Sequence, residues 1–331
     1  MEGGDSIGSP GSMTHRVRKA FVLGAGLGAR LRPLTDVLPK PLLPIFGKPL
    51  ITFALDHLFQ AGIEKIWINI HHLHHKFGTL ICDEHYRAVE LVHELNLLET
   101  GGGIKNLETR IGSETFIVYS GDILTDIAIE ELIEAHFRQQ NEVTLALRST
   151  GLSGAVRWRS DTGQIIDLAG DLAFEATGGY DFAGVSIWNP SAFARIPENT
   201  RISFVPILRD WLKAGGKIGG VVLENDRWFN VGTRAEYLRL HQVIAEGGWS
   251  PRYIRDVKWP AFIERSAKIS STSTIKGVSY VGDNCHIDHD VLIENSILLA
   301  GSSVASGASL RSCIVAGAKV SCGVYAWRDF V

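Results

Sequence analysis

The residues best suited to chemistry gather near the start of the chain, in the stretch FVLGAGLGARLRPLTDVLPKPLLP. Gly24, Gly26 and Gly28 lack a Cβ, so the backbone there can turn tightly and present successive N–H groups to an anion. Arg30 adds a forked cation that suits phosphate oxygens. Lys40, which lies between two prolines, adds a point charge for a second phosphate. The stretch therefore predicts a loop that binds a phosphorylated ligand.

Two familiar phosphate-binding patterns do not describe this loop. The P-loop pattern GxxxxGK[ST] is absent. GAGLGA fits the dinucleotide pattern G-x-G-x-x-A, but the RLRPLT that follows interrupts the helix that should begin there. The glycines alone would predict a structural turn, whereas the glycines together with Arg30 and Lys40 favour phosphate binding.

The elements around the loop predict where it lies in the fold. Short apolar strands (KAFVL, EKIWINI, ETFIVYS, EVTLALRS) alternate with helical segments (PLITFALDHLFQAGI, IAIEELIEAHFRQQ). This alternation predicts an α/β domain with a Rossmann-like, mostly parallel sheet and helices on both faces. Ligands of such sheets bind at the carboxyl ends of the strands. The glycine loop and the Ser-Gly-Asp that ends at Asp122 both follow strands, so we expect them to meet there.

The C-terminal part of the chain has a different pattern. From about Pro260, aliphatic residues recur at every sixth position, with two shifts of phase, among Gly, Ser, Asn, Asp and Ala. These residues are Ile263, Ile269, Ile275, Val281, Ile287, Ile293, Leu298, Val304, Leu310, Ile314 and Val320. Such a repeat is typical of a parallel β-helix, whose coils bury their apolar corners only by stacking on one another.

These patterns divide the chain into three parts. Residues 1–15 are small and polar and lack the apolar segment of a secretory signal, so they are predicted to be a disordered leader or an expression tag. Residues 16–250 form the predicted α/β domain, and residues 251–331 form the predicted β-helix domain. The segment SPRYIRDVKWP links the two.

Composition narrows the classes of function. The 331 residues carry a formal net charge of -3, which gives no basic surface for nucleic acid. The four cysteines lie far apart with no CxxC spacing, so they predict neither a zinc site nor a disulfide framework and suit a reducing cytoplasm. No apolar run reaches the length of a membrane helix. We expect a cytoplasmic protein without a nucleic-acid or membrane partner.

The loop and several later segments together resemble a known family. GAGLGARLRPLTDVLPKPLLPIFGKPLI is similar to the signature of sugar-1-phosphate nucleotidyltransferases, G-x-G-[TS]-R-L-x-P-L-T followed by P-K-P, with Ala29 at the Thr or Ser position. ELNLLETGGGI, YSGDILTD, DFAGVSIWNP and RWFNVGTRAEYL resemble further blocks of the family. The resemblance covers residues 19 to about 245. A C-terminal left-handed β-helix is common in this family, which agrees with the sixfold repeat.

The resemblance implies a reaction and a set of site residues. A sugar 1-phosphate would attack the α-phosphorus of a nucleoside triphosphate and release pyrophosphate, with Mg²⁺ as cofactor. The catalytic residues would be Arg30, Lys40 and Asp122. The metal would be held by Asp122 and Asn230. Nucleotide binding would fall to Leu23, Gly24, Ala25, Gly26, Gly28, Glu94, Thr100, Gly101 and Gly102, and sugar binding to Gly154 and Gly184.

Asn230 departs from the family pattern, which has a second metal-binding aspartate at this position. An amide oxygen can ligate Mg²⁺ but brings no negative charge. Asn230 can be a tolerated variant with weaker metal affinity, an introduced inactivating change, or a mark of a natural paralogue that binds a nucleotide sugar without turnover. Because Arg30, Lys40 and Asp122 are all present, we favour an active enzyme.

Glu99 departs from the family pattern in a segment that concerns substrate specificity, since most relatives have glycine at this position. LETGGGI, and the lack of an E-K-P segment between Arg159 and Tyr180, resemble N-acetylmuramate-1-phosphate uridylyltransferases. That enzyme usually has no β-helix, and mannose- and heptose-1-phosphate guanylyltransferases also resemble the chain, so they stay as alternatives.

Histidine clusters raise two further hypotheses. HHLHH at positions 71 to 75 could bind zinc, but no Cys or carboxylate completes the set, so strand-end packing is favoured. Asn69 and His71 could instead touch substrate. His286 and His289 lie in the repeat, and many hexapeptide-repeat proteins are acyltransferases, so an acyltransferase stays as a third function. By resemblance, the β-helix could also assemble a homo-oligomer.

Overall fold

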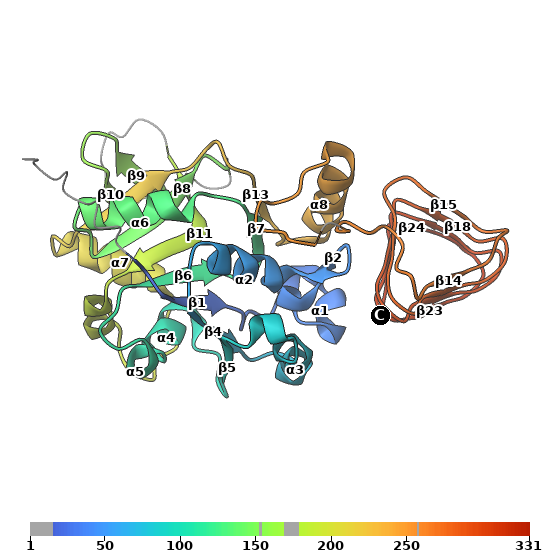
Figure 1. Cartoon of the computed structure of the whole chain (residues 1–331), viewed down its shortest axis with the longest axis horizontal. Coiled ribbons are helices and arrows are strands. Elements are labelled where there is room, and N and C mark those ends of the chain that lie inside the picture. The colour runs from blue at the N-terminus through green and yellow to red at the C-terminus, as the bar shows by residue number, and fades with distance from the viewer. Residues whose placement is uncertain (1–15, 152–153, 169–178, 257) are drawn as a thin grey trace, which may run out of the picture.

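The structure of the chain, a computed structural model, describes residues 16–151, 154–168, 179–256 and 258–331. The predicted leader, residues 1–15, lies outside the described residues, as does part of the segment between Arg159 and Tyr180. An α/β domain forms one end of the molecule, and a triangular β-helix forms the other, next to α8 (Arg234–Gly247) (Figure 1). In the described part of the chain, no helix is both long and apolar enough to span a bilayer.

The α/β domain is built on a nine-stranded sheet in the order β5-β4-β1-β6-β11-β8-β12-β10-β9. From β5 to β6 the neighbouring strands are parallel, as the sequence predicts. β11 is antiparallel to both neighbours, and so is β10, which makes the Rossmann-like sheet a mixed one. The strands are β1 (Lys19–Leu23), β4 (Lys65–Ile70), β5 (Val89–His93), β6 (Phe116–Ser120), β8 (Val143–Arg148), β9 (Val156–Arg159), β10 (Gln164–Leu168), β11 (Asp181–Trp188) and β12 (Ile218–Val222).

Helices bury both faces of this sheet, because its central strands are apolar on both sides. In β1, Ala20 and Val22 belong to one core cluster and Phe21 to another, and all three are fully buried. The first cluster includes residues of α2 (Leu50–Gln60) and α6 (Ile129–Arg138). The second includes residues of α4 (Glu99–Lys105), α5 (Glu108–Ile111) and α7 (Phe204–Lys213). Continuous burial explains why the sequence pattern could not separate parallel from antiparallel strands.

Two small sheets extend the α/β domain towards the β-helix. β7 (Ile123–Thr125) continues from the end of β6 and pairs with β13 (Trp228–Asn230). β2 (Pro44–Ile45) and β3 (Lys48–Pro49) form a hairpin before α2. Short helices α1 (Leu34–Val37) and α3 (Gly78–Ile81) lie at the edge of the domain. The C-terminal end of α2 is followed by Gly62 at a φ of 84°, the left-handed turn that its glycine predicts.

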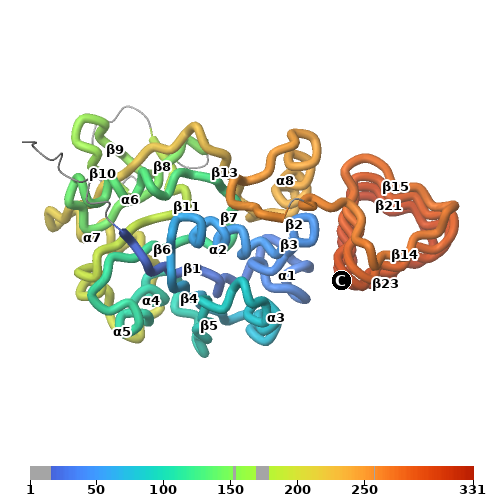
Figure 2. The backbone as a smooth tube through the Cα atoms, in the orientation of Figure 1, coloured from blue at the N-terminus to red at the C-terminus, as the bar shows by residue number. Residues whose placement is uncertain are grey.

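The C-terminal strands form three four-stranded parallel sheets, the three faces of a β-helix whose coils stack on one another (Figure 2). This arrangement agrees with the predicted left-handed hexapeptide-repeat fold. The first face contains β14 (Lys268–Ile269), β17 (His286–Ile287), β20 (Ser303–Val304) and β23 (Lys319–Val320). The second contains β15 (Thr274–Lys276), β18 (Leu292–Glu294), β21 (Ser309–Arg311) and β24 (Val324–Ala326). The third contains β16 (Tyr280–Val281), β19 (Ile297–Leu298), β22 (Ile314–Val315) and β25 (Asp329–Phe330).

The third face of the β-helix is buried on both sides. Val281, Leu298 and Val315 point inward into the β-helix core. The alternate residues, Tyr280, Ile297 and Ile314, join a cluster that also contains α8 and the segment before α2. Ile314 thus packs outward, and Val315 takes the inward position, because successive coils differ in length and shift the sixfold phase. Ile263, the first residue of the predicted repeat, is 46% exposed.

Two buried histidines make the stability of the fold depend on pH. His57 donates to or accepts from the Tyr119 hydroxyl, and His241 bonds the Tyr237 carbonyl. Burial lowers the pKa of each from 6.5 to about 4. Between these two values the unfolded chain binds more protons than the folded chain, so the free energy of unfolding falls as the pH falls.

We expect acidification from about pH 6.5 to about pH 5 to remove about 1.5 kcal/mol of stability per histidine. Urea unfolding at both pH values measures the loss. The variant His57→Gln should show a shallower pH dependence than the parent chain, and the exposed His75→Gln should show the same dependence. Equal stability of the parent chain at both pH values would contradict the assignment of two neutral buried imidazoles.

Candidate active site

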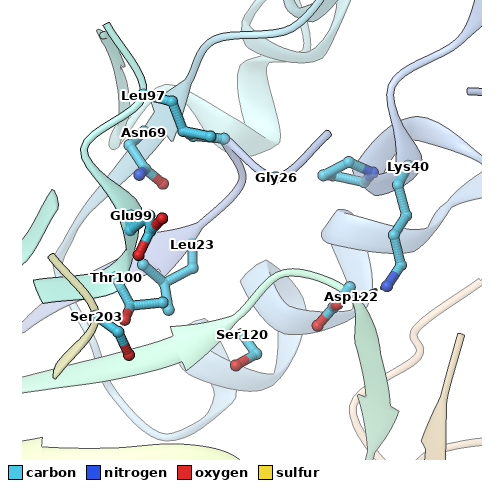
Figure 3. A pocket seen from close by; sticks show the side chains of 12 residues that line it. Leu23, Gly26, Lys40, Asn69, Leu97, Glu99, Thr100, Ser120, Asp122 and Ser203 are labelled. Carbon is cyan, nitrogen blue, oxygen red and sulfur yellow. Dashed lines mark hydrogen bonds and ion pairs between the residues drawn. The ribbon is translucent and has the colours of Figure 1, made fainter. Parts of the chain in front are cut away.

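A cavity of about 330 Å³ lies at the carboxyl ends of β1, β4 and β6 (Figure 3). Lys40 and Asp122 lie on one side of it, and Asn69, Glu99 and Thr100 lie on the opposite side. The residues that line it are Leu23, Ala25, Gly26, Lys40, Pro41, Asn69, Leu97, Glu99, Thr100, Ser120, Asp122 and Ser203. The glycine loop and the Ser-Gly-Asp segment therefore meet at this edge of the sheet, as the parallel strand order predicts.

The glycine loop is tied to the neighbouring strand. The Gly24 N–H donates to Asn69 Oδ1 over 2.8 Å, and a Cβ on Gly24 would lie 2.8 Å from the Asn69 carbonyl oxygen. Gly26 is exposed at the cavity. Gly28 has a φ of 64°, and a Cβ there would lie 3.0 Å from the Lys40 Cβ. The glycines therefore serve close backbone approach and a left-handed turn, and the turn brings the loop against Lys40.

Lys40 and Asp122 form an ion pair inside the cavity. Lys40 Nζ lies 2.5 Å from Asp122 Oδ2. Lys40 is 8% exposed, in the short helical turn Lys40–Leu42 that begins after Pro39. The Asp122 side chain is 39% exposed and comes directly before β7. A charge-assisted bond of this length fixes the ammonium group where a phosphate in the cavity would meet it.

Asn230 and Arg30 lie beside this pair. Asn230 pairs with Ile123 across the β7–β13 ladder, and the Val231 N–H donates to the Asp122 carbonyl over 3.1 Å. A Cβ on Gly232 would lie 2.9 Å from Arg30 Nη2 and 3.0 Å from Asn230 Nδ2, so the two side chains converge. Arg30 is exposed. Of the predicted catalytic and metal residues, Lys40 and Asp122 line the cavity, whereas Arg30 and Asn230 do not line it and belong to neighbouring segments.

The donor set at this end suits Mg²⁺ only in the presence of phosphate. Mg²⁺ is usually held by one or two carboxylates together with substrate phosphates. Asp122 supplies one carboxylate, of which one oxygen already binds Lys40, and Asn230 supplies a neutral amide oxygen. Among the described residues, no group of three His, Cys, Asp or Glu side chains could hold a metal. The chemistry of these donors fits a weakly bound Mg²⁺ that arrives with a triphosphate.

The second predicted nucleotide-binding segment, from Glu94 to Gly102, holds residues that line the cavity in place. Glu94 is 2% exposed, and its carboxylate accepts from Asn69 Nδ2 over 2.8 Å and from the Leu98 N–H over 3.0 Å. It therefore orients Asn69, which in turn holds Gly24. Gly101 and Gly102 both donate to the Ile202 carbonyl, over 2.8 and 3.1 Å. Side chains at these two positions would strike the backbone of residues 200–204, so the glycines serve helix packing.

Two residues of this segment face the cavity itself. Thr100 lines it, and its hydroxyl accepts from the Phe204 N–H over 3.0 Å. Glu99 lines it at a φ of 62°, and its carboxylate accepts from Arg201 Nε over 2.9 Å. Arg201 lies in a neighbouring cavity of about 590 Å³. Glu99 is thus the second carboxylate at the cavity, on the side opposite Asp122.

The two predicted sugar-binding glycines differ in their contacts with the cavity lining. Gly184, at a φ of 86°, sits at an irregular part of β11, and a Cβ there would lie 3.2 Å from the Ser120 hydroxyl. The Gly154 N–H donates to Asp181 Oδ1 over 2.9 Å, and Gly154 is not among the lining residues. The roles of both in sugar binding stay predictions.

The histidine clusters have structural partners. His71 bonds the Glu94 carbonyl over 2.8 Å, and His72 bonds the Thr35 carbonyl over 2.6 Å. In the β-helix, His286 lies 3.1 Å from Asp288, and His289 bonds the Ser270 hydroxyl over 2.7 Å. These contacts favour the packing interpretation of HHLHH.

Several lining residues were not among the predicted site residues. Ser120 could have been found, because it precedes Gly121 and Asp122 at the end of a strand. Asn69 was considered only as a residue that could touch substrate. Leu97 and Ser203 carry no sequence signal, since they reach the cavity through the packing of α4 against the segment before α7.

Comparisons with known proteins identify the family and support the fold. The model of the nucleotidyl transferase family matches residues 19–247, and that of the GMPPB C-terminal domain matches residues 257–327. The solved structure of the inositol-1-phosphate CTP transferase from T. maritima superposes with a TM-score of 0.57 at 18% identity, covering 67% of this chain and 92% of that one. At this identity the superposition supports the fold alone.

Two curated relatives differ in how much of the chain they match. N-acetylmuramate alpha-1-phosphate uridylyltransferase of Neisseria meningitidis serogroup B is 31% identical over 238 residues, 70% of this chain and 99% of the relative. Mannose-1-phosphate guanylyltransferase of Mycobacterium tuberculosis is 28% identical over 281 residues, 83% of this chain and 77% of the relative. Because the nucleotidyl transferase model matches residues 19–247, more than half of the chain, the chain belongs to this family.

Proposed function

We propose that this chain joins a nucleoside triphosphate to a sugar 1-phosphate and releases pyrophosphate. The observation that carries the proposal is the Lys40–Asp122 ion pair at one end of a cavity that begins at the glycine loop. The pair supplies a fixed cation and a carboxylate oxygen where phosphates would meet. The opposite side supplies Asn69, Thr100 and main chain that suit a nucleoside, next to the Glu99 carboxylate that is paired with Arg201.

The reaction needs alignment and charge neutralisation more than covalent help from the protein. An oxygen of the sugar 1-phosphate bonds to the α-phosphorus, and the bond from that phosphorus to the bridging oxygen breaks, so pyrophosphate leaves with the electron pair. Lys40 would neutralise charge on the reacting phosphates, and the exposed Arg30 would contact the leaving pyrophosphate. Asp122 and Asn230 would hold Mg²⁺, which would neutralise further phosphate charge.

The nucleoside and the sugar would lie at the other parts of the cavity. Leu23, Ala25 and Gly26 would contact the nucleoside through the main chain, with Gly24 and Gly28 setting the shape of the loop. Glu94, Gly101 and Gly102 would act from behind, by orienting Asn69 and α4. Thr100 would face the nucleoside directly. Gly184 would admit the sugar next to Ser120, and Gly154 would lie at the rim.

Two substrate pairs are supported by different observations. The 31% identical uridylyltransferase and the LETGGGI segment support UTP with N-acetylmuramate 1-phosphate or a similar sugar. The guanylyltransferase relative spans more of this chain, and the GMPPB C-terminal domain model covers residues 257–327 of the β-helix part, which supports GTP with mannose 1-phosphate or a heptose 1-phosphate. We place the uridylyltransferase reaction first, because this relative has the higher identity, 31% against 28%, and is matched over 99% of its own length.

The other hypotheses have less support. Lys40, Asp122 and the shaped cavity favour catalysis over a paralogue that only binds a nucleotide sugar. For an acyltransferase, His286 and His289 would have to act from side chains that already bond Asp288 and Ser270. The four cysteines are free thiols, which suits the cytoplasm as the proposed location. Assembly of a homo-oligomer through the β-helix stays a prediction that light scattering can test.

The experiment that tests the proposal is a pyrophosphate-release screen with Mg²⁺, crossing ATP, GTP, CTP and UTP with a panel of sugar 1-phosphates. We expect release with UTP and N-acetylmuramate 1-phosphate. Preference for GTP with mannose 1-phosphate would support the second pair. Nucleotide-sugar binding without release from any pair would contradict the proposal and support the non-catalytic paralogue.

The variant Asn230→Asp should lower the Mg²⁺ concentration needed for half-maximal activity by about tenfold, the scale on which changes at a metal site act. The added carboxylate would lie beside Asp122 across the β7–β13 ladder, where Asn230 now offers only an amide oxygen. The control is Asn199→Asp, which adds the same charge at the rim of the neighbouring cavity. Activity in neither the parent chain nor Asn230→Asp would refute the enzyme assignment, and activity only in Asn230→Asp would identify the asparagine as the defect.

A further inference from the structure

The turn after Asn230 joins the active site to α8. Asn230 is held next to β7, and the Val231 N–H donates to the Asp122 carbonyl. α8 begins at Arg234. A shift of the first turn of α8 would therefore move Asn230 relative to Asp122.

A capping box makes this turn part of α8. Thr233 Oγ accepts from the Glu236 N–H over 3.3 Å and donates to Glu236 Oε2 over 2.9 Å. The same Oε2 accepts from the Gly232 N–H over 2.9 Å. Such reciprocal bonds fix the residues before a helix to its first turn. Residues 232 and 233 should therefore follow any displacement of the helix end.

Arg234 attaches this helix end to the last coils of the β-helix. Its Nε donates to Asp329 Oδ1 and its Nη2 donates to the Ser312 carbonyl, both over 2.6 Å. Its guanidinium carbon also lies 5.9 Å from the centre of the Trp327 ring. The Asp329 side chain is 10% exposed and that of Arg234 is 23% exposed. Solvent screens such a pair less than an exposed one, so it holds a defined geometry.

The rest of the junction packs α8 against both neighbours. The outward row of the third β-helix face, Tyr280, Ile297 and Ile314, shares a buried cluster with α8. The Tyr237 hydroxyl donates to the Pro44 carbonyl over 2.6 Å, in the hairpin that follows the Lys40 turn. α8 therefore connects the β-helix to the Asn230 turn. The hairpin after the Lys40 turn contacts both α8 and the β-helix itself, where the Phe46 ring lies 6.0 Å from the Tyr280 ring.

We propose that Arg234 is a positioning residue, which uses its bonds to Asp329 and Ser312 to hold the Asn230 turn in the active site. The inference rests on the proposed function and adds a role for the β-helix in it. An asparagine is not drawn to its place by charge, so its amide oxygen depends on the scaffold to stay beside Asp122.

The test compares Asp329→Ala and Arg234→Lys with the control Glu294→Ala in the full-length chain. Glu294 forms a similar ion pair with Arg311 over 2.9 Å within the β-helix, and its side chain makes none of the bonds of Arg234. Deuterium exchange of the backbone amides of residues 228–236 is the first readout. We expect exchange there to rise about tenfold or more in Asp329→Ala, with the central strands β1 and β6 unchanged, because these amides lose a neighbouring constraint. Glu294→Ala should leave this segment unchanged.

Kinetics form the second readout. We expect kcat of Asp329→Ala to fall by about tenfold or more, since small misplacements at a reacting centre cost at least this much. The KM for the sugar 1-phosphate should change less than kcat. The kcat of Arg234→Lys should lie between that of the parent chain and that of Asp329→Ala. A lower unfolding temperature with unchanged exchange in residues 228–236 and unchanged kcat would overturn the proposal.

The two readouts separate this inference from the proposed function. If the parent chain released no pyrophosphate from any pair, the exchange measurement would still test whether Arg234 holds the turn. If Asp329→Ala did not fold, the test would use Arg234→Lys. This variant keeps the positive charge but lacks the guanidinium group that bonds Asp329 and Ser312 together. Unchanged exchange in the folded variant would overturn the proposal whatever the activity.

Discussion

Lys40→Ala is expected to lower kcat for pyrophosphate release by about a hundredfold to a thousandfold, the cost of removing one preorganised charge or donor from a reacting centre. The ammonium group lies 2.5 Å from Asp122 and is nearly buried, so water cannot replace it in the same geometry. The fold should survive, because Asp122 is 39% exposed and can be solvated when its partner is lost. Saturating assays with the preferred substrates, together with circular dichroism, measure both effects.

Lys48→Ala is the matched control for this change. Lys48 follows the same segment and also forms an ion pair, with Asp56 over 2.8 Å, but it does not line the cavity. Its removal should leave kcat within about twofold of the parent value, as expected for a residue outside the reacting centre. If Lys40→Ala also stayed within this range, the role assigned to the Lys40–Asp122 pair would be refuted.

The sequence predicted one end of the cavity better than the other. The positions of Lys40, Asp122 and the glycines can be predicted from the local sequence, because their residue types and the strands before them place them at one sheet edge. Asn69 and Glu94 act as a pair through a hydrogen bond between two neighbouring strands, and neither residue type alone reveals it. Ser203 reaches the cavity from a segment that contacts α4 far along the chain, which no local pattern records.

The same limit applies to the fold. The alternation of strands and helices predicted the α/β domain, and the sixfold repeat predicted the β-helix. β11 resembles the parallel strands in burial, so its antiparallel direction depends on which strands it joins. Val315 replaced Ile314 on the inward row because the coils differ in length, and both residues are aliphatic. Patterns of residue type predict elements and their buried sides, whereas direction and phase follow from the connections.

Glu99 shows how a residue can be identified correctly as unusual without its contacts being predictable. Its position in LETGGGI marked it as a specificity determinant. The structure adds that it lines the cavity opposite Asp122 and is held by Arg201, which comes from a segment about a hundred positions later. Its charge is therefore partly neutralised by a partner that the motif does not contain, and a substrate would meet an ion pair there.

Asp122→Asn is expected to lower kcat by about a hundredfold or more, since it removes the proposed charged metal ligand and the partner of Lys40 together. The other proposed ligand, Asn230, brings no carboxylate to replace it, so the loss should exceed that in a site with two aspartates. The asparagine keeps the shape of the side chain, and the carbonyl bond to Val231 stays. The fold should therefore be retained.

Two measurements separate the effects of Asp122→Asn. Calorimetry with Mn²⁺ and a non-hydrolysable triphosphate should show metal affinity falling by about tenfold or more, as for the loss of one ligand. The control Asp36→Asn removes an exposed carboxylate that pairs with Arg32 near the same loop, and it should change neither metal affinity nor kcat. Because Lys40 and Asp122 touch, the double variant Lys40→Ala with Asp122→Asn should lose less activity than the product of the single losses. Fully multiplicative losses would mean that the two side chains act independently, against the pairing on which the proposed mechanism depends.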